Sequence, residues 1–500
     1  MTALLIAASA IVRRANPILK ARIIETLQAR FHGRVELEGI GVSVLHGIEV
    51  SGNRLRIYPP EGDPGTPAGQ PLISLDRFSF HAGLTGLFLD PMHVGAVHVS
   101  GLQIDIPPGQ LGQAAGKGGK GGGKSKILVD EIVCDNSRLV ISATNPNKDP
   151  KDFEIKHIEL HNMGSDEPWT YDATLTNAIP RGEIHASGTF GPWRTDGPGE
   201  SAVAGHYTFD HADLNTIKGI GGILSSVGDF KGQLNKIVIE GSTETPDFSL
   251  DTANRPVPLH TTFEAIVDAT TGDTRLEQVK ATLRNSSFTT GGSVINVKGK
   301  GHIIELDVDI PAGRMQDFLA LAVNTDPPVI TGTVKMSAKL RIRPGKDRVA
   351  DRLSMQGKFN LQAIHFSNTQ VQDKVDMMSL RARGKPREAK PGAPDVNSQM
   401  NGIFSMHEGV IKLADLTYVM PGARVMLDGI YTLDGQTFDF HGKVDTDVAL
   451  SQMVDSRWLS LLLRAAGPFF RREGGGAEIP VRISGTRSEP KFGLDVLKRH

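Results

Sequence analysis

Apolar and polar residues alternate at every second position along most of this chain. The segments Leu259–Val267, Ile304–Ile310 and Val334–Ile342 all follow this pattern. Successive side chains of a strand point to opposite faces, so a period of two predicts half-buried β-strands. A loose repeat of glycine followed by alternating residues, as at 357–361 and 429–433, predicts turns and bends between strands. The predicted fold is mainly β, an elongated, curled antiparallel sheet.

Helical segments are few. Asn16 as N-cap and Pro17 as first helical residue predict a helix over 17–32, with Ile23 and Leu27 on its apolar stripe. Further helices are expected at 212–226, 314–323 and 450–470. We expect these to cap or plug the sheet, or to contact a membrane.

Composition shifts divide the chain. The apolar run Leu4–Val12 is shorter than the roughly 20 residues that span a bilayer, and it is interpreted as the second half of an anchor helix. A tract of Gly and Lys forms a predicted linker. The expected segments are a truncated membrane anchor (1–14), an N-terminal helix-plus-β portion (15–110), the linker (111–126) and a long β-sheet groove (127–500) with a C-terminal helical plug near 450–472.

Charge and motifs argue against several functions. Lys and Arg total 55 against 56 Asp and Glu, so no net positive field favours nucleic acid. Residues 118–125 match GxxxxGK[ST], but a flexible tract precedes them and an alternating strand pattern follows. The strand and helix that make this motif bind phosphate are therefore not expected, and no nucleotide partner is predicted.

Metal and catalytic sites are not predicted either. The single cysteine, Cys134, excludes an intrachain disulfide and a multi-cysteine metal cage. His157 and His161 lie four apart on an expected strand, hence about 13 Å apart, too far to share one metal. No serine-nucleophile or dinucleotide motif is present. We therefore expect no enzyme, no cofactor and no metal site.

The apolar face of the sheet must be removed from water, at about 25 cal/mol per Å². Because helices are few, either the sheet folds onto itself as a sandwich, or it curls into a trough that accepts acyl chains. The alternation alone indicates burial, in a core or in a groove. The predicted groove-lining residues are Val334, Met336, Leu340, Ile342, Leu427, Tyr431, Leu433, Phe438 and Phe440.

Several segments, in this order, resemble the AsmA-like family of Gram-negative bacteria, relatives of TamB and of the eukaryotic bridge-like lipid-transfer proteins. They are residues 16–20, 33–37, 71–75, 94–102, 259–265, 420–425, 479–486 and 490–492. The resemblance implies an inner-membrane anchor, a periplasmic β-groove, phospholipid as partner and no catalytic residues.

The expected function is therefore that of a membrane-anchored periplasmic protein that binds or conducts phospholipid and supports outer-membrane lipid homeostasis. Its expected location is the bacterial inner membrane, with most of the chain in the periplasm. The alternative is a non-enzymatic assembly factor that receives other envelope β-proteins at its sheet edges. A third class is an enzyme, chiefly one acting on glycans.

Overall fold

The computed structural model describes most of the chain. The described residues are 33–43, 48–59, 69–82, 92–106, 127–141, 150–163, 167–192, 198–324, 326–433, 437–455, 475–486 and 489–495, with single positions 17, 20, 21, 23–25, 27, 28, 147, 148, 470 and 472. The predicted anchor, the predicted linker at 111–126 and most of the predicted plug lie outside these residues.

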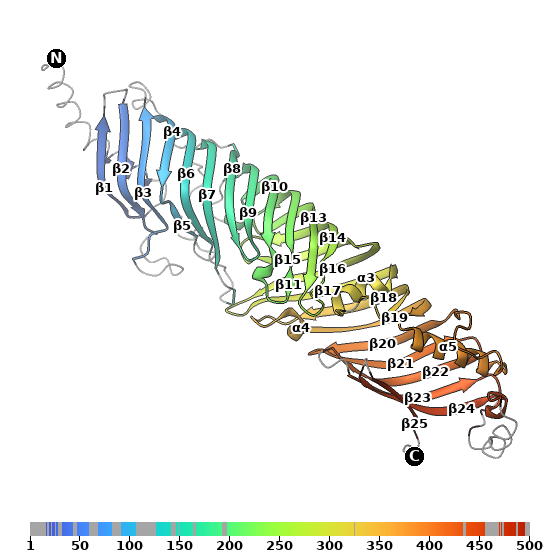
Figure 1. The fold of residues 1–500 in the computed structure, drawn as a ribbon. Helices are drawn as coiled ribbons and strands as arrows, with labels where there is room; N and C mark the ends of the chain where they lie inside the picture. The colour runs from blue at the N-terminus through green and yellow to red at the C-terminus, as the bar shows by residue number, and fades with distance from the viewer. Residues whose placement is uncertain are drawn as a thin grey trace, which may run out of the picture.

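One long mixed sheet makes up the described part of the molecule, with 66% of the described residues in strands and 11% in helices (Figure 1). The prediction of a mainly β fold is confirmed. The strands are β1 (Val35–Ser43), β2 (Ile48–Ile57), β3 (Ile73–Ala82), β4 (Met92–Ser100), β5 (Gln103–Ile106), β6 (Ile127–Ile141), β7 (Lys151–Met163), β8 (Trp169–Ala178), β9 (Arg181–Phe190), β10 (Ala202–Asp213), β11 (Ile220–Gly221), β12 (Ile223–Gln233), β13 (Lys236–Leu250), β14 (Val257–Asp268), β15 (Asp273–Leu283), β16 (Ser286–Val297), β17 (Gly301–Arg314), β18 (Ile330–Ile342), β19 (Leu353–Phe366), β20 (Gln399–His407), β21 (Val410–Met420), β22 (Ala423–Thr432), β23 (Thr437–Thr446), β24 (Ala477–Thr486) and β25 (Pro490–Leu494).

Nearly every strand pairs antiparallel with the next one in sequence, from β1–β2 at one end to β24–β25 at the other. The exception lies near the N-terminal end, where β4 and β5 both pair antiparallel with β3 and parallel with β6. The short β11 pairs with β13 beside β12, which joins β10 to β13. The pairing of β4 and β5 with β6 makes the sheet continuous across the predicted linker.

The sheet twists along its length, so strands that run nearly vertically at the N-terminal end in Figure 1 run nearly horizontally at the C-terminal end. Left-handed residues within strands, among them His211, Ala363 and Asp415, coincide with shifts of register that mark bulges, and bulges increase this twist. The chain exposes 28313 Å², whereas a compact protein of 53.8 kDa would expose roughly 18,000 Å². An elongated single sheet explains the excess.

Within the described residues, three α-helices and three 3₁₀ turns with defined bounds accompany the strands. They are α3 (Met315–Ala322), α4 (Val349–Arg352), α5 (Thr369–Ala382), η2 (Pro198–Glu200), η3 (Leu214–Thr216) and η4 (Leu450–Gln452). The helix predicted at 314–323 is confirmed by α3. Every described position between 17 and 28 is helical, as predicted. No helix among the described residues is long and apolar enough to cross a membrane.

The helix predicted at 212–226 is wrong. This stretch contains the end of β10, the turn η3, β11 and the start of β12. Gly219 and Gly222 both adopt positive φ, a conformation that interrupts a helix and that glycine adopts readily. The helix α5 was not predicted. Its start carries a recognisable signal, because the Asn368 side chain accepts a hydrogen bond from the backbone N–H of Val371.

Buried apolar side chains gather in three clusters. The first lies among β1 to β7, where Ile23 and Leu27 of the N-terminal helix pack on it. The second lies between β17 to β24 and α5, and a small third cluster lies under α3. The core of this protein is therefore distributed along the sheet rather than gathered at one centre.

Candidate functional site

Eight of the nine predicted groove-lining residues lie on one face of the sheet. Cross-strand partners share a face, and Val334, Leu361 and Met400 are partners across β18, β19 and β20. The same chain of partners continues through Tyr418 to Val425, two residues before Leu427. Val334, Met336, Leu340 and Ile342 come from β18, Leu427 and Tyr431 from β22, and Phe438 and Phe440 from β23, while Leu433 follows β22 in a turn. We call this the apolar face.

One row of partnered residues crosses nearly the whole sheet on this face. It takes one residue from every strand except β5, β11 and β25, and every member except Thr290 is apolar, aromatic or glycine. The members of this apolar row are Ile40, Gly52, Phe78, Val99, Cys134, Ile158, Ala173, Ala186, Tyr207, Gly228, Gly241, Phe263, Val279, Thr290, Val308, Ala338, Gly357, Phe404, Leu413, Gly429, Phe440 and Ile483.

The spacing of neighbouring strands gives the apolar row its length. At about 4.8 Å per strand the row extends over roughly 100 Å. All of its members are buried or half-buried, and none is fully exposed. Apolar surface is thus continuous from β1 to β24 without an intervening charged side chain.

Glycines in the row lie beside aromatic rings. Gly52 on β2 is the partner of Phe78 on β3, and a Cβ atom at Gly52 would overlap the Phe78 ring. The absence of a side chain lets the ring lie over the neighbouring backbone, an arrangement known to support glycines in sheets. The aromatic groups therefore cover the sheet and keep the apolar face shallow at these points.

Helices cover only part of the apolar face. Ile310, Val334 and Leu361 are 1%, 3% and 2% exposed, in the cluster that includes Ala382 of α5. Further along the same strand as Val334, Met336, Leu340 and Ile342 remain partly exposed. The apolar face therefore has a helix-covered margin and an open band.

Two buried carboxyl groups hold these helices in place. Asp317 of α3 accepts a hydrogen bond from the Ser286 hydroxyl at 2.8 Å. Asp376 of α5 accepts one from the backbone N–H of Val396 at 2.9 Å and one from the Gln372 amide at 3.0 Å. Burial raises the pKa of Asp376, and these two hydrogen bonds oppose that rise. Both carboxyl groups have partners within the fold, so they have a structural role here.

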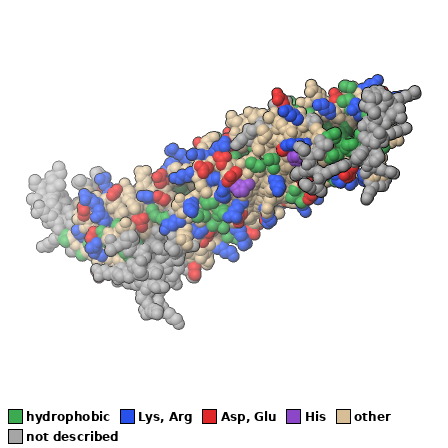
Figure 2. Space-filling view, turned by 90° about the horizontal axis from the view of Figure 1, so that it is seen from below, with side chains coloured by type: hydrophobic (Ala, Val, Ile, Leu, Met, Phe, Trp, Pro, Cys, Tyr) green, Lys and Arg blue, Asp and Glu red, His purple; other side chains and the backbone are tan. Residues whose placement is uncertain are grey.

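The open band continues onto the C-terminal strands. Tyr431 and Phe438 are cross-strand partners, and both are half-buried. The rings of Phe438 and Phe440 stack with centroids 6.2 Å apart. Hydrophobic side chains reach the surface along the length of the molecule, between charged ones, in Figure 2.

Tyrosines on the apolar face report its low polarity. Burial raises the pKa of Tyr171 to about 12, because the phenolate loses hydration. Burial also raises the pKa of Tyr207 and of Tyr418, opposed by hydrogen bonds to Ser226 and Ser398 respectively. A charged group on this face is therefore disfavoured.

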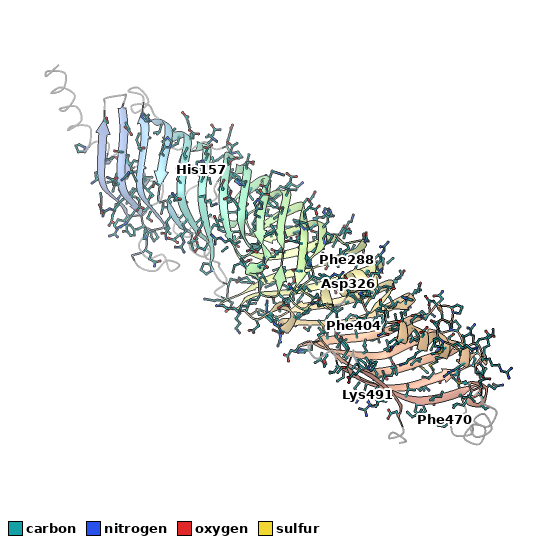
Figure 3. All side chains as sticks on the ribbon, viewed as in Figure 1. His157, Phe288, Asp326, Phe404, Phe470 and Lys491 are labelled. Atoms are coloured by element: carbon teal, nitrogen blue, oxygen red, sulfur yellow. The ribbon has the colours of Figure 1, made fainter. Side chains whose placement is uncertain are left out.

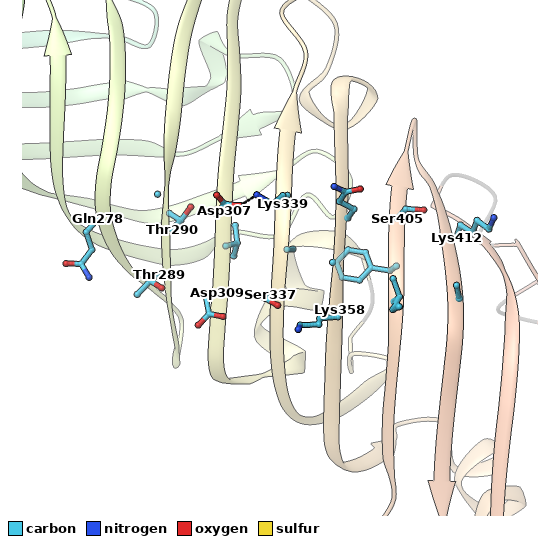
Figure 4. Close-up of a pocket in the computed structure, with 18 of the residues that line it drawn as sticks. Gln278, Thr289, Thr290, Asp307, Asp309, Ser337, Lys339, Lys358, Ser405 and Lys412 are labelled. Atoms are coloured by element: carbon cyan, nitrogen blue, oxygen red, sulfur yellow. Dashed lines mark ion pairs between the residues drawn. The ribbon is translucent and has the colours of Figure 1, made fainter.

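The opposite face is polar, as the alternating acidic residues predict. Asp307 pairs with Lys339 at 2.9 Å and Glu305 with Arg341 at 3.4 Å, each across β17 and β18. A hollow of about 960 Å³ lies over β15 to β21, and its lining includes Asp309, Lys339 and Lys358 of the polar face together with Val308, Ala338 and Phe404 of the apolar row (Figure 4). None of the nine predicted groove residues lines this hollow.

A group of ionisable side chains on the polar face was missed from the sequence. Glu131 on β6 is the cross-strand partner of His161 on β7, and Glu159 lies two residues from His161. Their potential metal-ligand atoms lie within 4.8 Å of one another. His157 contacts Asp135 and Glu159, so Glu159 is a neighbour of both histidines that were expected not to share a metal. Figure 3 places His157 in the N-terminal half of the sheet.

Comparison with known proteins returned no relative. No protein-family model, no curated protein and no solved structure matches this chain.

Proposed function

We propose that this protein binds phospholipid acyl chains along the apolar face and conducts them over the length of the sheet. The single observation that carries the proposal is the apolar row, continuous from β1 to β24. An acyl chain gains about 0.8 kcal/mol for each CH₂ group removed from water. A surface of constant polarity lets the chain move along it without crossing a charged barrier.

The proposed form of the binding site is a curled groove with the apolar face inside. Twist, bulges and glycines support it, because each lets a long sheet bend without steric penalty. The helix-covered margin at α3 and α5 would form one wall, with the open band beside it. Charged side chains on the other face would stay in water, as the Asp307–Lys339 and Glu305–Arg341 pairs do.

The proposed setting is the bacterial envelope. The resemblance to AsmA-like proteins supports tethering to the inner membrane, with the sheet in the periplasm and outer-membrane lipid homeostasis as the outcome. We propose a non-enzymatic role.

A matched pair of substitutions tests this proposal. Leu340 lies on the open band, and its cross-strand partner Met355 is followed by Gln356, which is exposed on the polar face. Leu340→Asp should lower the phospholipid that co-purifies with the full chain, measured by native mass spectrometry. Gln356→Asp places the same charge on the adjacent strand but on the polar face, beside Lys339, and should leave bound lipid unchanged.

Two results would contradict lipid binding on this face. One is equal lipid content in both variants and the parent. The other is a soluble parent protein that carries no phospholipid after gentle purification.

The sheet ends favour one alternative. Among the described residues, β1 pairs only with β2 and β25 only with β24, so each has an edge with unpaired backbone groups. An assembly factor would use such an edge to receive a strand of another envelope protein. Capture of unfolded outer-membrane β-proteins by lipid-free protein, unaffected by Leu340→Asp, would support that function instead.

A further inference from the structure

Three potential ligands converge on the polar face at β6 and β7. His161 Nδ1 lies 3.9 Å from Glu131 Oε1, and the three ligand atoms of Glu131, Glu159 and His161 lie within 4.8 Å of one another. All three side chains are half-buried, which restricts their rotation but leaves water access. Within the described part of the chain, Glu131, Glu159 and His161 are the residues that bring three potential metal-ligand atoms this close together.

A second contact orients Glu159. His157 Nε2 lies 3.2 Å from Glu159 Oε1, and His157 Nδ1 lies 2.7 Å from Asp135 Oδ1. These two contacts hold the His157 ring between the carboxylates of Asp135 and Glu159. His157 is thus a positioning residue that holds one Glu159 oxygen and leaves the other free.

The local charge balance differs from that of neighbouring carboxylates. Asp152 pairs with Arg138 and Glu183 with Lys156 on the same part of the sheet. In the described residues neither Glu131 nor Glu159 has a Lys or Arg at ion-pair distance. Glu159 also lies opposite another carboxylate, Asp172 of β8. Among the described residues, the two glutamates of the cluster therefore have histidines, and no lysine or arginine, at ion-pair distance.

We propose that Glu131, Glu159 and His161 bind a divalent transition-metal cation, with Zn²⁺ the best match. One imidazole and two carboxylates suit Zn²⁺ better than Mg²⁺ or Ca²⁺, which prefer oxygen ligands alone. Bond lengths of about 2.0–2.2 Å require these partly exposed side chains to close in slightly, and water completes the coordination. The site is independent of the lipid-binding face.

The position of the site suggests what the metal does. It joins β6 to β7, and β6 is the strand whose other edge carries the parallel pairs with β4 and β5. Parallel pairing is slightly less stable per residue than antiparallel pairing. A bound cation would cross-link two strands next to this junction and stabilise the N-terminal part of the sheet by mass action.

Titration of the full chain with ZnCl₂ after chelation and desalting tests the site. We expect one tightly bound Zn²⁺ per chain by calorimetry and a Zn²⁺-dependent rise in Tm. His161→Ala and Glu131→Gln should each weaken binding by about ten-fold or more and remove the Tm rise, and His157→Ala should weaken binding through Glu159.

His206 provides the matched control. It pairs with Asp229 on the same face, at 3.0 Å, outside the three-ligand cluster. His206→Ala should therefore leave Zn²⁺ affinity and the Tm rise unchanged. Equal affinity in the parent, His161→Ala and Glu131→Gln, or no stoichiometric uptake by the parent, would overturn the assignment.

Discussion

Gly429 on β22 and Phe440 on β23 are direct cross-strand partners in the apolar row, and a Cβ atom at Gly429 would overlap both the Phe440 ring and the Asp439 carbonyl. The ring therefore occupies space that only glycine leaves open. This pair shows how the face combines large aromatic groups with close strand packing.

Gly429→Val should consequently destabilise the protein, by about 1–3 kcal/mol, since overpacking forces side chains and backbone to shift. Gly493 is a suitable control, because a Cβ atom there would meet no other atom within 4 Å and its backbone is not left-handed. Urea denaturation followed by circular dichroism measures both variants. Equal urea midpoints for Gly429→Val and Gly493→Ala would show that the space between Gly429 and Phe440 can accept a side chain.

Asp317→Ala should release α3 from the sheet. The substitution leaves the Ser286 hydroxyl, 2.8 Å from the carboxylate, without this buried acceptor, at a cost of about 1–3 kcal/mol. Asp326→Ala serves as control, because that carboxylate is 77% exposed in its 3.1 Å pair with Arg255 and should contribute little. Hydrogen exchange of the α3 amides would detect the release, and unchanged protection in Asp317→Ala would argue against the anchoring role.

The thiol of Cys134 should not react with an aromatic disulfide reagent in the folded protein. Burial, and then the neighbouring Asp135 carboxylate, raise the pKa of this thiol to about 11, and the residue has no exposed surface. Ser405→Cys adds a comparison thiol on the exposed polar face. This thiol should react in the folded protein, whereas Cys134 should react only after the protein is unfolded in urea. Rapid reaction of the parent protein would show that the N-terminal core opens readily.

Alkaline titration should reveal Tyr171 as a late-ionising phenol, because burial raises its pKa to about 12. The unfolded chain ionises this group near pH 10, so the unfolded state loses its proton first. Stability should therefore fall as the pH rises from 10 towards 12, and less so in Tyr171→Phe. Absorbance at the phenolate band and urea midpoints at the two ends of this window give the measurement. An unshifted phenol would mean that water reaches this part of the apolar face.

How far the fold could be predicted depended on whether the information was local. The period of two placed Val334 and Leu340 correctly on one face, because neighbours within a regular strand fix that relationship. A bulge breaks it, as at Asp415, where the register shifts and the residues on the apolar face change from odd positions such as Leu413 to even positions such as Leu416. Alternation therefore assigns faces within a strand, but not across a bulge.

Contacts between distant segments could not be predicted. Glu131 and His161 meet only because β6 and β7 pair in one particular register, which no short motif specifies. The helix α5 was hidden by an apolar content too low to give a clear stripe, although Asn368 marks its beginning. The residues that line the hollow come from seven strands, β15 to β21, so no single segment encodes it.

From β12 to β25 each strand pairs with its successor in the sequence. Removing or duplicating one hairpin would therefore take away or insert two adjacent strands, and the flanking strands would still meet in antiparallel order. Each such event changes the length of the sheet by about 10 Å. The apolar face and the polar face of the remaining strands keep their sides. A gene encoding this architecture can thus adjust the reach of its product in small increments, without redesigning any other part.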